Sequence, residues 1–304
     1  MLFNSLFGRK NSTSSTANSY NGVKLNKKNH QPRQMFFEPL ESRDLLTVTI
    51  GAIDNDTYNE IRATYPEFNL PELQADLNVM TITPDNGALS LSDLQNAIND
   101  AGETTLPDLI LVMTSASVNS VTYASAADEL SINIDSTQYG SVTILGWGEE
   151  NFTLDANQQS RVMTIDGESA IVNLGGLTIT SDNGNYSNNI INNGCLTVTN
   201  CSINDLSINN NGLLYFSPSE NEVLSISNNI SNNNTARTIK TGAGTLTTSS
   251  WINNNVEVFE GTLQITDSFG SGKRFSGQAT IFAGATLRCS SHDSLGYGSS
   301  TTQL

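Results

Sequence analysis

A short glycine-and-leucine pattern recurs through the second half of the chain and constrains the fold more than any other feature. Each copy reads Gly-x-Leu-x-apolar or a close variant, and an apolar residue stands a few positions before it. The leucines of the copies are Leu177, Leu196, Leu214, Leu246, Leu263 and Leu287. A unit of roughly 20 residues is too short to bury its own apolar face, so successive units must stack to be stable.

Short strands are also predicted ahead of the repeat. From about residue 108, apolar residues alternate with Thr, Ser or Asn in brief runs bounded by turn residues. These runs cover residues 109–113, 130–134, 142–145, 152–154 and 162–165. We predict an all-β chain whose strands coil around a narrow apolar interior, with each strand paired in parallel to its neighbour in the next coil.

Asparagine marks the expected corners of these coils. Runs of three recur at residues 209–211, 232–234 and 253–255. Asparagine tolerates left-handed backbone conformations, and stacked asparagines form hydrogen-bonded ladders. The alternative fold is an antiparallel β-sandwich, for which the Asn-Gly pairs at 86–87, 183–184, 193–194 and 211–212 would supply hairpin turns. The last two pairs share a register with the repeat, which favours stacked coils.

One segment before the strands has helical periodicity. Ser90 is a suitable N-cap, Asp93 occupies the third helical position, and Gly102 suits a left-handed C′ position. The apolar stripe of this helix, predicted over residues 90–101, comprises Leu91, Leu94 and Ile98. We expect it to cover the open first coil, whose backbone groups would otherwise be unpaired.

A second helix is predicted from Asp56, as its cap, to Tyr65, where Pro66 stops it. Asp54, Asn55 and Asp56 could also offer oxygen ligands to calcium, but the glycine and distal glutamate of an EF-hand loop are missing. We therefore interpret Asp56 as a helix cap and expect neither a metal nor a cofactor.

The composition fits a thin core, because only 14% of the 304 residues are charged and only 37% are hydrophobic. The net charge of −16 is unevenly spread: the first 46 residues hold seven basic and three acidic residues, or +4, which leaves −20 for the rest. We predict a disordered basic export segment at 1–46, a capping region at 47–107 and a β-helix at 108–304. The acidic balance argues against nucleic acid as a partner, and no apolar run is long enough for a transmembrane helix.

The stretch from Phe36 to Leu46 carries an export signal of an unusual kind. Its Leu40, Glu41, Arg43, Leu45 and Leu46 resemble the Leu-Glu-Pro-Arg-x-Leu-Leu motif of planctomycete-type extracellular proteins, with Ser42 where that family usually has proline. The resemblance implies export to the cell surface or beyond. The alternative interpretation is a short amphipathic helix that starts after Pro39.

Two further resemblances concern the fold. Residues 237–289, with Lys-Thr-Gly-Ala-Gly-Thr-Leu at 240–246, are similar to an autotransporter-associated β-strand repeat, and residues 88–200 are similar to β-helical surface proteins with a pectin-lyase-like fold. Together they imply a right-handed, single-stranded parallel β-helix on a secreted or surface-attached protein. The repeat stops at Leu304 without a visible cap, which leaves two interpretations: the chain is a truncated relative, or a partner covers the last coil, as in end-to-end association of two copies.

Pectin-lyase-like folds often carry sugar-cutting enzymes, so catalytic residues were sought. Asp135, Asp155 and Asp166 each follow a predicted strand, and stacked on one face they could form an acidic patch for glycoside hydrolysis. The simpler interpretation is that each aspartate forms a turn at a strand end. The Gly-His-Gly and Asp-Asp motifs of polygalacturonases have no match, so we assign no catalytic residue.

The remaining reactive side chains suggest no further chemistry. Cys195, Cys201 and Cys289 form no disulfide framework, and Cys195 and Cys201 are interpreted as small buried residues. Trp147 and Trp251 are candidates for sugar stacking or for packing against a neighbouring coil.

Two functions stay open: a non-catalytic surface protein that binds a glycan or a protein partner, and a polysaccharide-active enzyme that uses the three aspartates.

Overall fold

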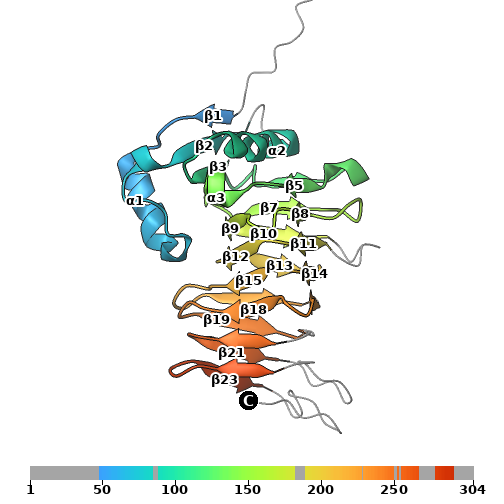
Figure 1. The fold of residues 1–304 in the computed structure, drawn as a ribbon. Helices are drawn as coiled ribbons and strands as arrows, with labels where there is room; N and C mark the ends of the chain where they lie inside the picture. Colours follow the sequence, from blue (N-terminus) through green and yellow to red (C-terminus); the bar gives the residue numbers. More distant parts are fainter. Residues whose placement is uncertain are drawn as a thin grey trace, which may run out of the picture. The chain divides into compact units, whose positions relative to one another are not determined.

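The computed structural model describes residues 48–84, 88–181, 189–227, 229–249, 252, 255–266 and 278–290, all within one compact unit. These residues are mostly β, with 23 short strands in sheets of ten, eight and five strands. From β3 to β19 the chain visits the three sheets in a fixed order, ten-stranded, eight-stranded and five-stranded, once in every coil. Successive coils stack above one another in Figure 1. The predicted all-β class is confirmed, and the arrangement is consistent with a β-solenoid.

The ten-stranded sheet runs the whole length of the stack. Its neighbours pair in parallel, except that β1 pairs antiparallel with β2 at one edge. In spatial order its strands are β1 (Val48–Ile50), β2 (Asn78–Ile82), β3 (Asp108–Thr114), β6 (Val142–Gly148), β9 (Ile171–Gly175), β12 (Cys195–Thr199), β15 (Leu213–Phe216), β18 (Arg237–Lys240), β20 (Val256–Val258) and β22 (Ala279–Ile281).

The other two sheets are parallel throughout their described strands. The eight-stranded sheet contains β4 (Ser120–Thr122), β7 (Phe152–Asp155), β10 (Leu177–Thr180), β13 (Ser202–Asn204), β16 (Val223–Ile226), β19 (Thr245–Thr248), β21 (Thr262–Ile265) and β23 (Thr286–Cys289). The five-stranded sheet contains β5 (Leu130–Ile132), β8 (Met163–Ile165), β11 (Ile190–Asn192), β14 (Ile208–Asn210) and β17 (Ile230–Asn232). This parallel pairing rules out the antiparallel sandwich for the described residues.

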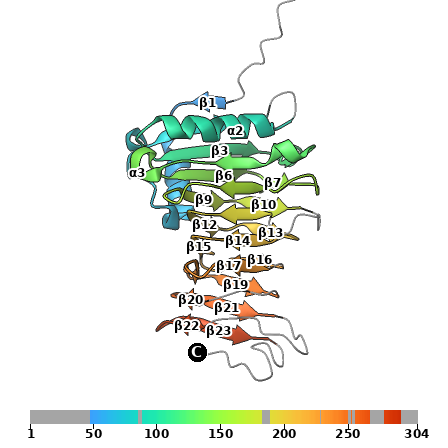
Figure 2. The same ribbon diagram turned by 45° about the vertical axis from the view of Figure 1, so that its right-hand side comes forward.

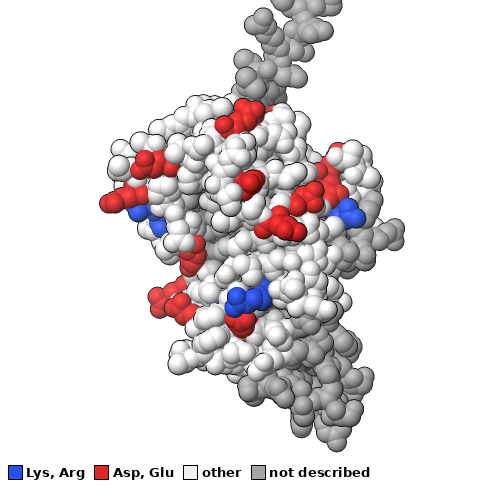
Figure 3. Space-filling model, viewed as in Figure 1, with Lys and Arg blue, Asp and Glu red and all other residues white. Residues whose placement is uncertain are grey.

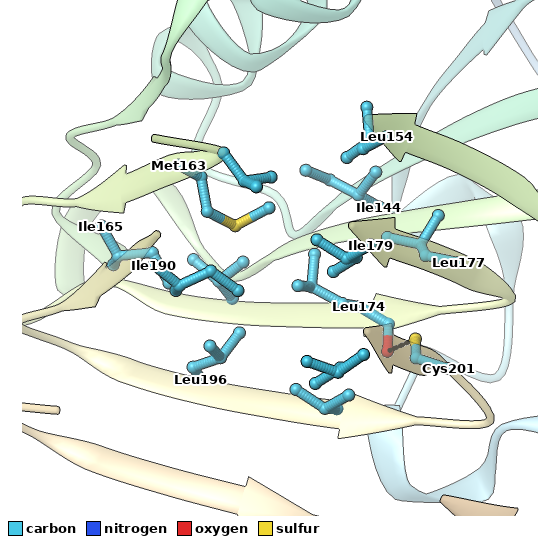
Figure 4. Close-up of a cluster of buried hydrophobic side chains, with 14 of the residues drawn as sticks. Ile144, Leu154, Met163, Ile165, Leu174, Leu177, Ile179, Ile190, Leu196 and Cys201 are labelled. Carbon is cyan, nitrogen blue, oxygen red and sulfur yellow. Dashed lines mark hydrogen bonds between the residues drawn. The ribbon is translucent and has the colours of Figure 1, made fainter. Parts of the chain in front are cut away.

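The interior is a continuous apolar column to which every sheet contributes. In one coil, Leu174 of β9, Ile179 of β10 and Ile190 of β11 are all fully buried. Figure 4 shows these side chains pointing into the same interior from different strands. Cys201 lies there too, and its thiol donates to the carbonyl of Leu174 at 3.5 Å. The three cysteines are free: Cys201 is buried, as predicted, whereas Cys195 is half-buried and Cys289 is exposed.

The glycine-and-leucine copies occupy two different positions of the coil. Leu196 and Leu214 lie on β12 and β15 of the ten-stranded sheet, whereas Leu177, Leu246, Leu263 and Leu287 lie on the eight-stranded sheet. The long step from Leu214 to Leu246 therefore passes from one sheet to the next sheet of the following coil. The sequence pattern alone does not assign a copy to a sheet, because strands of all three sheets share the same inward and outward alternation.

The predicted helix at residues 90–101 is confirmed as α2 (Leu91–Asp100), with the Ser90 hydroxyl accepting from the amide of Asp93 at 3.3 Å. Leu94, Ala97 and Ile98 join the interior, and Figure 2 shows α2 above β3. The side-chain amide of Gln95 accepts from the backbone N–H of Ser131 and donates to its carbonyl, which satisfies the edge of β5. The predicted left-handed C′ position at Gly102 is wrong, because Gly102 lies inside the 3₁₀ turn η3 (Ala101–Glu103), which follows α2 directly.

The other predicted helix is α1 (Asn55–Thr64), and it ends where expected, before Pro66. Its N-cap is Asp54, not Asp56: the Asp54 carboxylate accepts from the amide of Thr57 at 2.8 Å and from its hydroxyl at 2.6 Å. The remaining short elements are α3 (Ser136–Tyr139), η1 (Pro66–Phe68), η2 (Gln74–Asp76) and η4 (Ala126–Asp128). None of the helices in the described ranges combines the length and hydropathy needed to cross a bilayer.

Asparagine ladders hold the corner between the five-stranded and ten-stranded sheets. In an inner ladder, the side chain of Asn192 donates to Asn210 at 2.8 Å, and Asn210 donates to Asn232 at 2.7 Å. An outer ladder runs in the opposite direction, because Asn211 donates to Asn193 at 2.8 Å and Asn233 donates to Asn211 at 3.3 Å. The corners approach so closely that a Cβ on Gly212 would lie 2.0 Å from the carbonyl oxygen of Gly194. The predicted ladder is confirmed, although Asn253 and Asn254 lie outside the described residues.

Candidate binding groove

The outer face of the ten-stranded sheet is covered at its first coils. Here the outward residues are apolar, and a second buried cluster forms between them and the segment from α1 to η1. The sheet contributes Val79, Leu109, Leu111 and Leu145, and the covering segment contributes Tyr58, Ile61, Tyr65 and Phe68. Trp147 packs against this cluster and is half-buried, which supports the packing interpretation over sugar stacking; Trp251 lies outside the described residues.

The cover ends at Gly175. The rings of Tyr65 and Phe68 stack on each other with centroids 5.1 Å apart and lie directly over this glycine. A Cβ on Gly175 would lie 2.8 Å from the Tyr65 ring and 2.9 Å from the Phe68 ring. Only glycine therefore lets the aromatic pair approach the sheet this closely, and the pair forms a wall at the boundary.

Beyond this wall the same face is polar. One outward row passes from Thr143 through Asn173 and Thr197 to Tyr215, each paired with the next across adjacent strands. The side-chain amide of Asn173 donates to the hydroxyl of Thr143 at 3.1 Å. Asn173, Thr197 and Tyr215 of this row form the floor of a groove of about 1060 Å³ that crosses β9, β12 and β15 and reaches the turn after β18.

The two sides of this groove differ in chemistry. At the strand starts, Ile171 and Cys195 line it, and Ile171 is 43% exposed. At the strand ends it is lined by the carboxylates of Glu67, Glu220, Glu222 and Glu260. Figure 3 shows that acidic side chains outnumber basic ones on the face it draws.

Among the groove glutamates, Glu67 has a carboxylate oxygen that is buried in the protein. Its Oε2 atom is buried without a hydrogen-bond partner. Burial raises the pKa of Glu67, and the nearby charge of Glu260 acts in the same direction. The position of Glu67 in η1, beside the aromatic wall, brings it to the groove.

The positive charge of Lys240 acts on the carboxylates of Glu67 and Glu260, yet its ammonium group is not available to a ligand. Its side chain is fully buried, and its ammonium donates to the carbonyls of Thr241 at 2.6 Å, Gly242 at 2.7 Å and Glu260 at 3.1 Å. Burial lowers the pKa of Lys240 to about 8, while Glu260 and Glu67 act in the opposite direction. All three N–H bonds are used to join the turns of two successive coils.

A second buried polar atom faces the groove without a partner. Ser217 follows β15, is 1% exposed and lines the groove, and its hydroxyl makes no hydrogen bond. Buried hydroxyls nearly always have a partner, so such an exception calls for an explanation. A ligand group that bonds this hydroxyl would supply one.

The structure does not place the three predicted aspartates in this groove. Asp135 caps α3, where it accepts from Thr137 and Ser169, and these bonds lower its pKa. Asp166 follows β8 and accepts from Asn193 at 3.4 Å, so it extends the outer ladder. Asp155 ends β7 in the eight-stranded sheet, a different sheet, and accepts from the amide of Asn157 at 2.8 Å. Each therefore forms a turn or corner where it stands.

In the described part of the chain, no three His, Cys, Asp or Glu side chains come together in a way that could hold a metal ion.

Arg237 and Glu257, on neighbouring strands, form an ion pair. The residues of the export motif, Leu40 to Leu46, and both histidines lie outside the described residues.

The groove residues were missed at the sequence level for different reasons. Tyr215 could have been found, because alternation along β15 directs it outward between inward-facing Leu214 and Phe216. Glu67 and Ser217 carried no such signal, because their place in the groove depends on contacts between the covering segment and strands more than 100 residues away. One such contact is the hydrogen bond from the Ser219 hydroxyl to the carbonyl of Thr64, 155 positions earlier.

No protein-family model matches this chain, and neither a curated protein nor a solved structure matches it. The function is therefore argued from the geometry of the groove.

Proposed function

We propose that this chain is an exported, non-catalytic surface protein that holds an extended ligand, either a glycan or a segment of a protein partner, in the groove of its ten-stranded sheet. The observation that carries the proposal is the groove itself: a polar floor at Asn173, Thr197 and Tyr215, beside a buried Ser217 hydroxyl that lacks a partner. A bound polar chain would complete the hydrogen bonding that the protein leaves open.

The proposed scaffold is a right-handed, single-stranded parallel β-helix. The fixed order of the three sheets and the parallel pairing of successive coils support it. Connections between parallel strands are right-handed in nearly all known cases. The proposal of export rests on the resemblance of residues 40–46 to an extracellular motif and on the acidic balance of the rest of the chain, which keeps a surface protein soluble.

An enzyme that uses Asp135, Asp155 and Asp166 is the less favoured alternative. Glycoside hydrolysis needs two carboxyl groups facing one another across the scissile bond. Asp155 ends a strand of the eight-stranded sheet, Asp166 follows a strand of the five-stranded sheet and Asp135 caps α3. Each accepts hydrogen bonds from its local turn or ladder. If the groove did cut a polysaccharide, Glu67 and Glu260 would be the pair to examine.

The proposal is tested by blocking the groove. Labelled neutral, acidic and amino-sugar oligomers and short peptides are titrated into the full chain and into the variant Thr197→Arg, whose long side chain fills the floor. The matched control is Thr247→Arg, at a half-buried outward position of β19 in the eight-stranded sheet. We expect binding that Thr197→Arg abolishes and Thr247→Arg leaves intact.

Two outcomes contradict the proposal. Binding that is equally strong in both variants would place the ligand elsewhere. Release of reducing ends from any oligomer, lost in Glu67→Gln, would show that the groove is catalytic.

A further inference from the structure

We infer that the groove selects an extended basic polypeptide segment, with basic side chains directed to the strand ends and apolar side chains to the strand starts. This inference rests on the proposed function and narrows its ligand to one chemical class. Four observations support it: the charge of the groove, the buried polar atoms without partners, the difference between the two sides of the groove, and the spacing of its floor.

The charge of the groove excludes anionic ligands and favours cations. Glu67, Glu220, Glu222 and Glu260 line it, and among its described lining residues there is no Lys, Arg or His. The buried ammonium of Lys240 is already bonded to three carbonyls, and Arg237 is paired with Glu257. Acidic glycans and nucleic acids would meet uncompensated repulsion here.

One buried polar atom points to a ligand independently of the acidic residues: the Ser217 hydroxyl, in a residue only 1% exposed, lines the groove without a partner. Among the acidic residues, the Glu67 Oε2 atom is also buried without a partner. A ligand ammonium or guanidinium beside Glu67 would offset the cost of burying its charge, and a ligand amide would satisfy the serine.

The difference between the two sides favours a polypeptide over an amino sugar. The carboxylates lie beyond the strand ends, whereas Ile171 and Cys195, the first residues of β9 and β12, line the groove at the strand starts. Leu213 is the next residue of this apolar row, although it does not line the groove. An extended polypeptide places successive side chains on opposite sides. Alternating basic and apolar residues would therefore meet the carboxylates on one side and the apolar row on the other, which an amino sugar could not do.

The floor suits the backbone of such a segment. The outward row at Asn173, Thr197 and Tyr215 presents an amide and two hydroxyls, one from each successive strand. Strands lie about 4.8 Å apart, so the strands crossed by the groove and the turn beyond them span roughly 15–20 Å, or about six extended residues.

The test uses the full chain and labelled peptides of about eight residues. One peptide alternates lysine and valine, a second has the same composition with the lysines in a block, and a third replaces lysine by glutamate. We expect the first to bind most tightly, with an affinity that falls as salt rises, and Glu67→Gln with Glu222→Gln to weaken it about tenfold or more. The control, Glu103→Gln with Glu168→Gln, alters exposed carboxylates that do not line the groove and should change the affinity less than twofold.

The variant Ile171→Ser tests the apolar side at an exposed position without changing the charge of the groove, so folding is not at risk, and it should weaken the alternating peptide more than the block peptide. Equal binding of the alternating and block peptides, or an unchanged affinity in the double glutamine variant, would overturn the inference. A neutral or amino-sugar oligomer that binds and is blocked by Thr197→Arg, while no peptide binds, would overturn it and leave the proposed function standing. If no ligand is sensitive to Thr197→Arg, both fail.

Discussion

The outer face of the ten-stranded sheet is built in two ways on either side of Gly175. Before it, outward residues such as Leu109, Leu111 and Leu145 are apolar and lie under the segment from α1 to η1. From β9, the strand that contains Gly175, onward, outward positions carry Asn173, Thr197 and Tyr215, which form the floor of the groove. The backbone pairing is the same on both sides, so the side chains alone decide whether the face is a core or a binding surface.

The largest effect is expected from removing the ring that ends the cover. Phe68 is 4% exposed and stacks on Tyr65, so Phe68→Ala should destabilise the cover by about 3–5 kcal/mol, as measured by chemical denaturation. Its matched control is Phe259→Ala: this ring also stacks, on Phe282, but it is 41% exposed and should cost about 1 kcal/mol. If Phe68→Ala and Phe259→Ala lowered the free energy of unfolding by the same amount, the covered face would be no better packed than the exposed ring pair.

The next effect concerns a buried charge in the covered region. Asp108 is fully buried, accepts from Asn78 at 2.8 Å with one oxygen and has no partner for the other. Burial raises its pKa to about 7, so the folded chain binds the proton more tightly than the unfolded chain does. Protonation of Asp108 therefore favours the folded state. The folded state has this full advantage below about pH 4 and loses it as the pH rises through 7.

Asp108→Asn should therefore raise the free energy of unfolding by about 2–4 kcal/mol at pH 8 and change it little at pH 4. The measurement is denaturation of both proteins at the two pH values, with the exposed-site variant Asp76→Asn as control. A gain of equal size at both pH values would show that the carboxyl is not the cause. Lys240, the buried charge of the uncovered region, has its three N–H bonds satisfied and offers no such gain.

A smaller effect is expected at the boundary itself. Gly175→Ala places a methyl group against Tyr65, Phe68 and Leu145 and should cost about 1–3 kcal/mol, because the wall must move. Gly102→Ala is the control, since the nearest atom to its Cβ would lie 3.9 Å away. Hydrogen exchange should then show faster opening of α1 without a change at β21; protection of α1 as in the unaltered chain would contradict the close contact.

The smallest effect is expected on the groove floor. Thr197→Val removes one outward hydroxyl from a half-buried site and should change the free energy of unfolding by less than about 0.5 kcal/mol. Ligand affinity should fall even so, and the two readouts together separate a binding surface from a core. A stability loss of several kcal/mol would show that the floor supports the fold after all.

Local patterns were enough to predict much of this fold. The alternation of residues 152–154 became β7, the Ser90 cap began α2, and the asparagine runs became ladders, because each of these depends on neighbours in sequence or on a repeat of itself. The sheet to which a given leucine belongs was not predictable, since Leu196 and Leu246 have the same local pattern in different sheets.

The groove was harder to predict than the strands. It depends on where the segment from α1 to η1 stops, and that is decided by contacts between Tyr65, Phe68 and Gly175, more than 100 residues apart. The buried charges of Asp108 and Lys240 were equally hidden, because charged residues are usually exposed and no local pattern marks the exceptions.

The inner asparagine ladder allows the coils to differ in length. Asn192 and Asn210 are bonded across 18 positions, and Asn210 and Asn232 across 22, yet both bonds bring the same corner into the same place. The asparagine bonds at each corner thus bring the chain into the same register before the next strand of the ten-stranded sheet begins. Insertions between corners would then project from the side of the stack without shifting the groove floor, so loops between corners can change in length while the groove keeps its spacing.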